Sequence, residues 1–348
     1  MHDRRAGTRW GAILAAGALA LVVVAPAAAQ DGAISVIGYA APEAATDYGW
    51  NQQGLIGTEA AAATIGATVI NASGAGYGDI APTLNSLKED GAQFIVAQAS
   101  GYGETAVAFA RENDIPVLVW EQSDQLTPGL VGDAETKAQE GGYLAGVLAA
   151  SMTQTGQVGI VVSATGDPNW QKQAGGFVAG ARSIDPDIVL HRAAISADGY
   201  GDEPGGKLVT EQVIAAGADV VFGMGDGSSF GMLAAVETTT PPGADQAWFI
   251  DVIGDKSSID EQGVLLSSVL WDFSGAYEQA LADLAAGTYG ETVYYLDAAN
   301  GGISILDTPY ITDEARAAIE AARAGIADGS IVVPETPTEA DVDALVGS

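Results

Sequence analysis

Residues 34–71 read ISVIGYAAPEAATDYGWNQQGLIGTEAAAATIGATVIN, and this stretch decides the fold. A β-branched run at 34–39 is followed by a polar turn, an Ala-rich segment of helical periodicity at 50–65, and a second β-branched run at 67–71. A strand, a helix and a strand in this order form a βαβ unit, whose two strands lie parallel in one sheet. The stretch therefore predicts a Rossmann-like α/β fold.

The same alternation of short β-branched runs and Ala-rich segments continues along the chain. It restarts after a long predicted helix at 135–152, so we expect two lobes, each built on a parallel sheet. Further strands are expected at 93–97, 116–120, 157–162, 188–191, 219–223, 248–252 and 264–270, and further helices at 79–90, 104–113, 170–183, 206–216 and 230–237.

The two predicted lobes begin alike. Asp47-Tyr-Gly-Trp50 follows the first strand of one half, and Asp167-Pro-Asn-Trp170 follows the first strand of the other. We interpret this similarity as an internal duplication. Doubly wound sheets bind ligands at the loops that leave the carboxyl ends of their strands. Trp50 and Trp170 are therefore expected on opposite walls of one cleft between the lobes.

The first thirty residues have the pattern of a cleavable signal peptide. Arginines at the N-terminus precede an apolar run at 11–25, and alanines at 27–29 precede Gln30. A membrane anchor is the alternative, but a spanning helix needs about 20 apolar residues. We expect residues 1–29 to be removed and the mature protein to be exported to the periplasm. It is not expected to be a lipoprotein, because the chain has no Cys to carry the lipid.

The composition excludes several classes of function. The chain has 13 Lys+Arg against 45 Asp+Glu, and a formal net charge of −32 disfavours nucleic acids and anionic membranes as partners. With no Cys and two His, it lacks the residues for thiol chemistry and for metal sites built from Cys or His. A hydrophobic fraction of 48% against 17% charged residues excludes a disordered chain. We expect neither a metal nor a cofactor.

An enzyme is the alternative from a different class. Residues 227–231, GSSFG, match the G-x-S-x-G pattern of hydrolase nucleophiles and lie between a predicted strand and a predicted helix. The general base of that arrangement is a His that follows the Ser in the chain, and no His follows Ser229. His191 ends an apolar strand, where a structural role is expected. The sequence favours a protein without catalysis and leaves a serine hydrolase acting through Ser229 as the alternative.

Four tryptophans lie at strand ends or on the loops that follow them: Trp50, Trp120, Trp170 and Trp271. Each has a carboxylate or an amide beside it in the sequence. A Trp at a strand end can simply fill the core. Four of them, each with a polar neighbour, suit a planar or ring-shaped ligand that aromatic faces stack and hydrogen bonds orient.

Three motifs of the chain occur together in a known family. Residues 47–51, DYGWN, are similar to its D-x-x-F-N loop; residues 140–146, EGGYLAG, to its E-G-x-Y-L-A-G helix; and residues 175–181, GGFVAGA, to its G-F-x-A-G segment. Over about 34–324 the chain thus resembles the basic membrane protein family, the PnrA-like substrate-binding proteins of ABC importers. The resemblance implies the type I periplasmic binding protein fold, in which three strands join two lobes that close on a ligand.

The resemblance also implies a ligand, because better-known members of the family bind purine nucleosides. Where these members have a Lys after a strand of the second lobe, this chain has SSVLW at 267–271. A free nucleobase, a related heterocycle and a sugar-like molecule are therefore alternatives to a nucleoside. From the matched positions and the tryptophans we expect ligand contacts from Asp47, Trp50, Asn51, Ser100, Trp120, Glu121, Trp170, Asp226, Phe230, Asp251 (or Asp255 in its place) and Trp271.

The family fold implies a division of the chain and a set of partners. The partners are a small-molecule ligand and an ABC permease in the membrane, and the protein is expected to be a monomer. A ligand-sensing module for a membrane receptor is the remaining alternative. The expected parts are a signal peptide at 1–29, an N-lobe at 31–132 with 272–299, a C-lobe at 133–271 with 300–348, and hinge strands near 131–133, 271–274 and 300–303.

Overall fold

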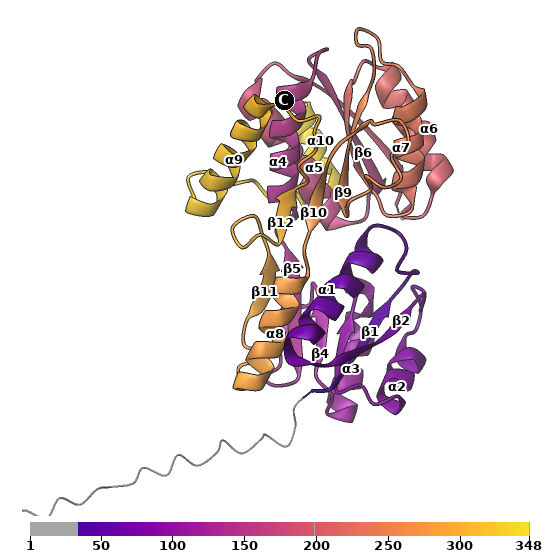
Figure 1. The fold of residues 1–348 in the computed structure, drawn as a ribbon, viewed down its shortest axis with the longest axis vertical. Coiled ribbons are helices and arrows are strands. Elements are labelled where there is room, and N and C mark those ends of the chain that lie inside the picture. Colours follow the sequence, from indigo (N-terminus) through magenta and orange to yellow (C-terminus); the bar gives the residue numbers. More distant parts are fainter. Residues whose placement is uncertain (1–33, 198, 348) are drawn as a thin grey trace, which may run out of the picture. The chain divides into compact units, whose positions relative to one another are not determined.

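The computed structural model describes residues 34–197 and 199–347, which form two six-stranded sheets (Figure 1). Helices flank each sheet, and parallel pairing of strands dominates both. This arrangement confirms the predicted α/β class with two Rossmann-like lobes. The expected signal peptide at 1–29 lies outside the described residues. Within the described ranges, no helix is long and apolar enough to cross a membrane.

The first lobe combines two separate segments of the chain. Its elements are β1 (Val36–Ala41), α1 (Trp50–Ile65), β2 (Thr68–Ser73), α2 (Ala81–Glu89), β3 (Phe94–Ala97), α3 (Gly103–Asn113), β4 (Val117–Trp120), β5 (Val131–Thr136), α8 (Ser274–Ala286) and β11 (Val293–Leu296). The strand order is β11-β5-β4-β3-β1-β2, with every neighbouring pair parallel. Helices α1 and α8 pack side by side against this sheet (Figure 1).

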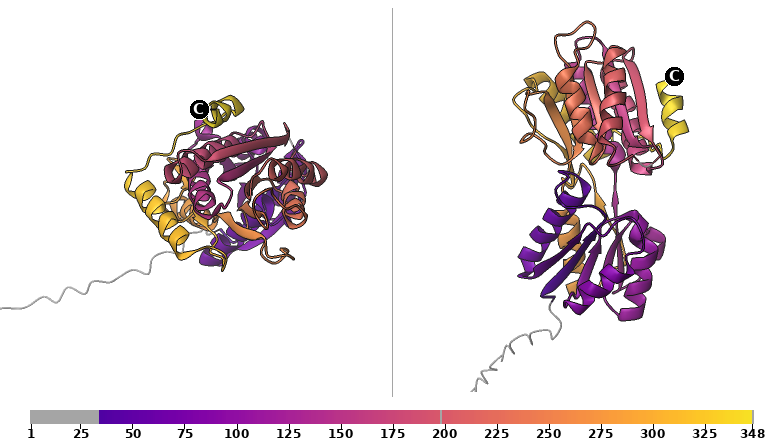
Figure 2. Two further views of the ribbon diagram at one scale, coloured as in Figure 1. Left: turned by 90° about the horizontal axis from the view of Figure 1, so that it is seen from above. Right: turned by 90° about the vertical axis from the view of Figure 1, so that its right-hand side faces the viewer.

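The second lobe repeats the plan with one antiparallel edge. Its elements are α4 (Ala138–Met152), β6 (Gln157–Ala164), α5 (Pro168–Ile184), β7 (Val189–Ser196), α6 (Glu203–Ala215), β8 (Val220–Met224), α7 (Ser228–Thr238), β9 (Trp248–Ile253), β10 (Leu265–Trp271), β12 (Ile303–Ile305), α9 (Asp313–Asp328) and α10 (Glu339–Val346). The strand order is β12-β10-β9-β8-β6-β7, and only β12 runs antiparallel to its neighbour. Figure 2 shows α6 and α7 side by side along this sheet.

The chain passes between the two sheets after β5, after β10, and between β11 and β12. The second passage is short, because β10 ends at Trp271 and α8 begins at Ser274. The expected lobe boundary between residues 132 and 133 lies inside β5, which pairs with β4 and β11 of the first sheet.

Two expected elements need correction. The helix expected at 135–152 begins only at Ala138, because residues 131–136 form β5 in the middle of a sheet. The strand expected at 188–191 continues to Ser196, because β7 pairs with β6 along nearly its whole length. The remaining predicted strands and helices agree with the structure to within a few residues.

Helices α4 and α5 approach each other through glycines. A Cβ atom on Gly142 or Gly146 of α4 would lie 2.0 or 2.1 Å from a backbone oxygen of α5. A Cβ atom on Gly176 or Gly180 of α5 would lie 2.1 Å from a backbone oxygen of α4. These glycines belong to the EGGYLAG and GGFVAGA motifs, so two of the three family-like motifs fix the packing of one helix pair.

Candidate ligand-binding site

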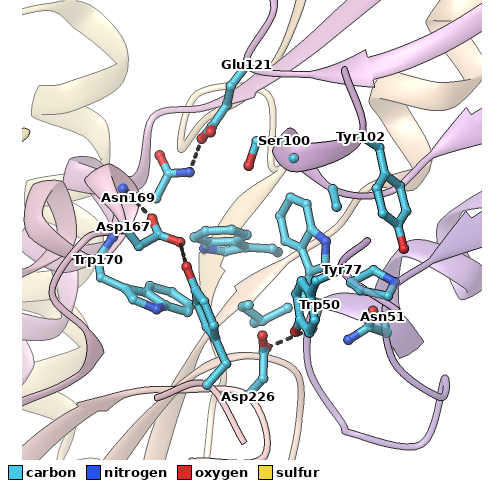
Figure 3. Close-up of a pocket in the computed structure, with 16 residues that line it drawn as sticks. Trp50, Asn51, Tyr77, Ser100, Tyr102, Glu121, Asp167, Asn169, Trp170 and Asp226 are labelled. Carbon is cyan, nitrogen blue, oxygen red and sulfur yellow. Dashed lines mark hydrogen bonds between the residues drawn. The ribbon is translucent and has the colours of Figure 1, made fainter. Parts of the chain in front are cut away.

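A cavity of about 190 Å³ lies between the two lobes (Figure 3). Its wall includes residues that follow the carboxyl ends of β1, β3 and β4 in one sheet and of β6 and β8 in the other, where parallel sheets place ligands. The lining residues are Pro42, Trp50, Asn51, Tyr77, Ala99, Ser100, Gly101, Tyr102, Glu121, Asp167, Asn169, Trp170, Tyr200, Asp226, Ile253 and Trp271.

Asp47 and Asp167 play the same structural role in the two lobes. The Asp47 carboxylate accepts hydrogen bonds from three backbone N–H groups at the start of α1, at 2.9–3.0 Å. The Asp167 carboxylate accepts from the backbone N–H groups of Asn169 and Trp170, at 2.8 and 3.4 Å. Each carboxylate thus fixes the helix start that brings a Trp to the cavity. This shared role agrees with the interpretation of an internal duplication.

Trp50 is anchored on the first lobe. Its indole N–H donates a hydrogen bond to the carbonyl oxygen of Gln98 at 2.7 Å. Its ring meets Trp120 and Phe273 edge to face, with centroids 4.8 and 5.3 Å apart. Trp50 is only partly buried and lines the cavity, so these contacts hold one ring face at a fixed position in the wall.

Trp170 and Trp271 form a second aromatic wall. Their ring centroids lie 6.1 Å apart at an interplanar angle of 41°. Only 3% of Trp170 and 2% of Trp271 is exposed, yet neither indole N–H has a hydrogen-bond partner within the described residues. A buried donor without an acceptor is costly. Both residues line the cavity, so a ligand could supply the missing acceptors.

Two tyrosines of the cavity wall stack on each other. Tyr77 and Tyr200 come from different lobes, and their rings stack with centroids 6.5 Å apart at 15°. The Tyr77 hydroxyl donates to Glu43 at 3.0 Å, and the Tyr200 hydroxyl donates to Asp167 at 2.8 Å. Because Tyr77 is 62% exposed, this stacked pair lies at the solvent side of the cavity.

Three carboxylates line the cavity: Glu121, Asp167 and Asp226. Burial, and then the charge of Asp167, raise the pKa of Glu121. Burial also raises the pKa of Asp167, against hydrogen bonds from Tyr200 and two backbone groups. Burial, and then the charge of Asp47, raise the pKa of Asp226 to about 8. The site therefore holds acidic groups whose charged forms the protein itself disfavours.

Several contacts cross from one lobe to the other at the cavity. The Asn169 side-chain amide donates to the Glu121 carboxylate, and the backbone N–H of Trp50 donates to Asp226 at 3.2 Å. Beside them, a Cβ atom on Gly254 would lie 1.9 Å from the backbone oxygen of Tyr48. The lobes are therefore in close contact, as in the closed form of a two-lobed binding protein.

The structure places four of the expected contact residues outside the cavity wall. Asp47 faces the start of α1. Trp120 is 1% exposed, and its indole N–H donates a hydrogen bond to the side chain of Gln98. Phe230 packs edge to face against Tyr48, with centroids 6.3 Å apart. Asp251 forms a fully buried ion pair with Lys256 at 2.5 Å, and its alternative Asp255 is exposed. The other expected residues, Trp50, Asn51, Ser100, Glu121, Trp170, Asp226 and Trp271, line the cavity.

Ser229 is held in the interior of the second lobe. It is fully buried, and its hydroxyl lies 2.7 Å from Asp251 and 2.9 Å from the carbonyl oxygen of Gly225. The one described His, His191, lies on β7 with its Nε2 atom 2.9 Å from Gln157. Ser229 is therefore closed off from solvent, and among the described residues no His lies beside it.

Several residues of the wall were not predicted from the sequence, among them Tyr77, Tyr102 and Tyr200. A signal for them exists, because each is the centre of a Gly-Tyr-Gly tripeptide, at 76–78, 101–103 and 199–201. In all three tripeptides the ring lies in the cavity wall. Gly76 has a positive φ of 79°, which favours glycine, whereas Gly103 begins α3 with a helical φ of −51°.

The two-lobed α/β fold with a cavity between the lobes is that of a solute-binding protein. The structure superposes on an ABC transporter solute-binding protein from Aeropyrum pernix K1 with a TM-score of 0.74 at 18% identity, covering 90% of this chain and 96% of that one. A solute-binding protein from Conexibacter woesei DSM 14684 gives a TM-score of 0.71 at 19% identity, covering 87% and 99%. At these identities the likeness shows the fold.

Residues 34–336 match the family described as ABC transporter substrate-binding protein PnrA-like, and the chain belongs to this family. It is a substrate-binding protein of an ABC transporter, and the predicted resemblance is confirmed. A relative is the ABC transporter nucleoside-binding protein BmpA of Lactococcus lactis subsp. cremoris strain MG1363, 27% identical over 270 residues, which cover 74% of this chain and 75% of that protein. Because the family consists of binding proteins and not of enzymes, the hydrolase interpretation of Ser229 is wrong.

Proposed function

We propose that the protein captures a purine nucleoside, a nucleobase or a similar ring-shaped small molecule in the cavity and delivers it to an ABC permease. The observation that carries this proposal is the cavity wall itself, in which tryptophan and tyrosine rings from both lobes surround polar side chains. Such a wall stacks a flat ring and orients it by hydrogen bonds. The similarity to a nucleoside-binding relative supports the nucleoside as a first candidate.

We propose different roles in binding for the aromatic and the acidic residues of the wall. We assign stacking to Trp50, Trp170 and Trp271, and acceptance of hydrogen bonds from ligand hydroxyl or N–H groups to Glu121 and Asp226. These groups would equally suit a sugar-like ring, which offers hydroxyl groups and apolar faces.

Residues behind the wall support it. In this proposal Asp47 fixes the start of α1 and Trp120 backs the ring of Trp50, so both act on the ligand through Trp50. Phe230 packs on Tyr48 of the first lobe, and the ion pair of Asp251 with Lys256 holds the loop that follows β9 in the second lobe. Asn51 and Ser100 reach the wall and add polar groups to it.

The proposed function also includes a cellular location and a partner protein. We propose that residues 1–29 direct export to the periplasm, where the mature chain acts as a monomer. The lobes would open to admit the ligand, close around it, and then dock on the permease. Delivery of the ligand state to a membrane receptor instead of a permease is the second candidate, and the genes beside this one distinguish the two.

A thermal-shift screen of purine nucleosides, free nucleobases and monosaccharides tests the proposed function. A ligand that binds only the folded protein raises its melting temperature, so one class should give a rise of several degrees. Isothermal titration calorimetry with that class should then give one site per chain. A flat response to all three classes would contradict the proposal.

A further inference from the structure

We propose that the cavity prefers a positively charged ring, such as an N-alkylated nitrogen heterocycle, over the neutral ring of the same shape. This inference rests on the proposed function, because it names the kind of ring that the same site selects. Aromatic rings and carboxylates are the main chemical groups of the wall, and none of the described residues that line it is Lys, Arg or His (Figure 3).

The aromatic rings favour a cation from several directions. Trp50 stands on the first lobe and Trp170 on the second. Trp271 lies between them, with its ring centroid 6.0 Å from that of Trp50 and 6.1 Å from that of Trp170, and the stacked tyrosines lie at the solvent side. The face of each ring carries a partial negative charge, and it attracts a cation most strongly where water is excluded. Trp is the best side chain for this interaction, and three Trp line one small cavity.

The carboxylates favour a cation as well, because the protein leaves their charge without a basic partner at the wall. Glu121 accepts from an amide, Asp226 accepts from a backbone N–H, and Asp167 accepts from a hydroxyl and backbone groups. All of these donors are neutral. Burial raises the pKa of each of the three carboxyl groups, and a positive charge that enters the cavity lowers it again, because the cation stabilises the charged carboxylate.

Two lysines act on these carboxylates from outside the wall. Lys256 forms a fully buried pair with Asp251, and the partly buried Lys172 lies 4.0 Å from Glu335. The charge of Lys256 lowers the pKa of Asp226 and that of Lys172 lowers the pKa of Glu121 and Asp167, but burial outweighs both. Neither lines the cavity. Since none of the described residues of the wall is basic, a ligand is the source of positive charge that the wall suits.

The unpaired indole N–H groups of Trp170 and Trp271 add a second requirement. Both are buried donors without an acceptor among the described residues, so a complementary ligand carries an oxygen acceptor in addition to its charge. A pyridinium carboxamide and an N-methylated purine nucleoside both satisfy this description. Each also has a neutral counterpart that differs by a single methyl group.

Calorimetric titration with these matched pairs tests the preference at pH 7. The pairs are 1-methylnicotinamide with nicotinamide, and 1-methyladenosine with adenosine. In at least one pair, the cation should bind about tenfold more tightly or better. The cation is attracted both to the faces of the aromatic rings and to the carboxylates of the wall. Equal or tighter binding of the neutral member in both pairs would overturn the inference and leave the proposed function intact.

Variants of the cavity carboxylates and of a surface carboxylate distinguish the effect of the cavity from that of the net negative charge of the chain. Glu121→Gln should reduce the ratio between cation and neutral affinity about tenfold. If this variant folds poorly, Asp226→Asn is measured in its place with 1-methylnicotinamide and nicotinamide at pH 9, above the pKa of about 8 of the Asp226 carboxyl, and should reduce the ratio in the same way. Glu278→Gln is the matched control, because Glu278 is an exposed carboxylate on α8 away from the cavity. An equal reduction in Glu278→Gln would overturn the inference, since the preference would then come from the net charge of −32.

The failure of the inference and that of the proposed function are distinct results. Binding of neutral nucleosides, nucleobases or sugars, with no binding of either cation, overturns the inference alone. The absence of binding by every ring, charged or neutral, overturns both.

Discussion

Trp50 and Trp120 touch each other but have different surroundings. Trp50 lines the cavity and is partly buried, whereas Trp120 is 1% exposed and lies outside the wall. Trp50→Ala should therefore weaken ligand binding about tenfold or more, because stacking on an aromatic ring contributes roughly 1–3 kcal/mol. Calorimetry on the variant measures this loss, and denaturant unfolding measures the stability that Trp50 contributes through Trp120 and Phe273.

Trp120→Ala is the matched variant. Removal of a buried ring of this size costs roughly 3–5 kcal/mol of unfolding free energy. The affinity of the folded fraction should fall much less than in Trp50→Ala. If Trp120→Ala weakens binding more than Trp50→Ala does, then Trp50 is a core residue and its place in the wall has no function.

Asp226 makes the stability of the ligand-free protein depend on pH. Burial, the charges of Asp47 and Glu43, and only partial compensation by Lys256 and the Trp50 N–H raise its pKa from 3.8 to about 8. Between these two values the folded protein binds a proton that the unfolded chain releases. The contribution of Asp226 to the free energy of unfolding therefore falls as the pH rises from about 4 to about 8.

Asp226→Asn should remove this dependence. Relative to the wild type, the variant should gain about 1 kcal/mol or more between pH 5 and pH 8, since one pKa unit corresponds to 1.36 kcal/mol. Urea unfolding at both pH values measures the difference, and the surface variant Glu278→Gln is the control. Burial also raises the pKa of Asp133, to about 7, but this group is present in both proteins and cancels. A constant difference between Asp226→Asn and the wild type would contradict the prediction.

At the scale of the elements, the helix pair α4 and α5 depends on residues without side chains. Gly146→Ala would place a methyl group 2.1 Å from the backbone oxygen of Phe177, which cannot move without shifting α5. We expect a loss of roughly 1–3 kcal/mol, the usual cost of overpacking, and ligand affinity close to that of the wild type. Denaturant unfolding and calorimetry measure the two quantities.

Gly275→Ala is the control for that substitution. Gly275 also lies in a helix, α8, but nothing stands within 4 Å of the position of its Cβ atom. The change should leave stability unchanged or raise it by up to about 1 kcal/mol, because Ala favours a helix more than Gly does. Equal effects of the two substitutions would show that the contact between α4 and α5 is not tight.

Local patterns predicted most elements up to Trp271 and none of the elements after it, and among the earlier ones β5 is an exception with a physical cause. Runs such as 94–97 and 158–162 are continuous and apolar because parallel strands are buried on both faces. Residues 131–136, VGDAET, are polar and Gly-containing, so they do not read as a central strand. They form β5 because neighbours on both sides supply the pairing and because Asp133 accepts a hydrogen bond from the backbone N–H of Gln122.

The part of the candidate site that was predicted from the sequence depends mainly on one residue type, tryptophan. Tryptophans beside polar residues led to Trp50, Trp170 and Trp271, all of which line the cavity. The pattern could not distinguish Trp120 from the tryptophans that line the cavity. Its burial depends on α8, a helix some 150 residues further along the chain. For the same reason the stacking of Tyr77 on Tyr200 was not predictable: it requires the two lobes to meet.

At the scale of the whole molecule, binding depends on how closely the lobes approach. Gly254 follows β9 of the second lobe, and a Cβ atom there would lie 1.9 Å from the backbone oxygen of Tyr48 in the first lobe. Because the obstacle is backbone, the closed arrangement has no room for a side chain at this position. An open form, with the lobes apart, would not make this contact.

Gly254→Ala should therefore weaken ligand binding tenfold or more while the free energy of unfolding stays within about 1 kcal/mol of the wild type, since each lobe keeps its own core. Calorimetry gives the affinity, and small-angle scattering gives the radius of gyration with and without ligand. The wild type should contract on binding, and the variant should contract less. Gly275→Ala, which introduces the same methyl group where nothing opposes it, should bind and contract as the wild type does. Normal affinity and normal contraction in Gly254→Ala would show that the lobes close without the contact between Gly254 and Tyr48, and would separate ligand capture from the closed arrangement described above.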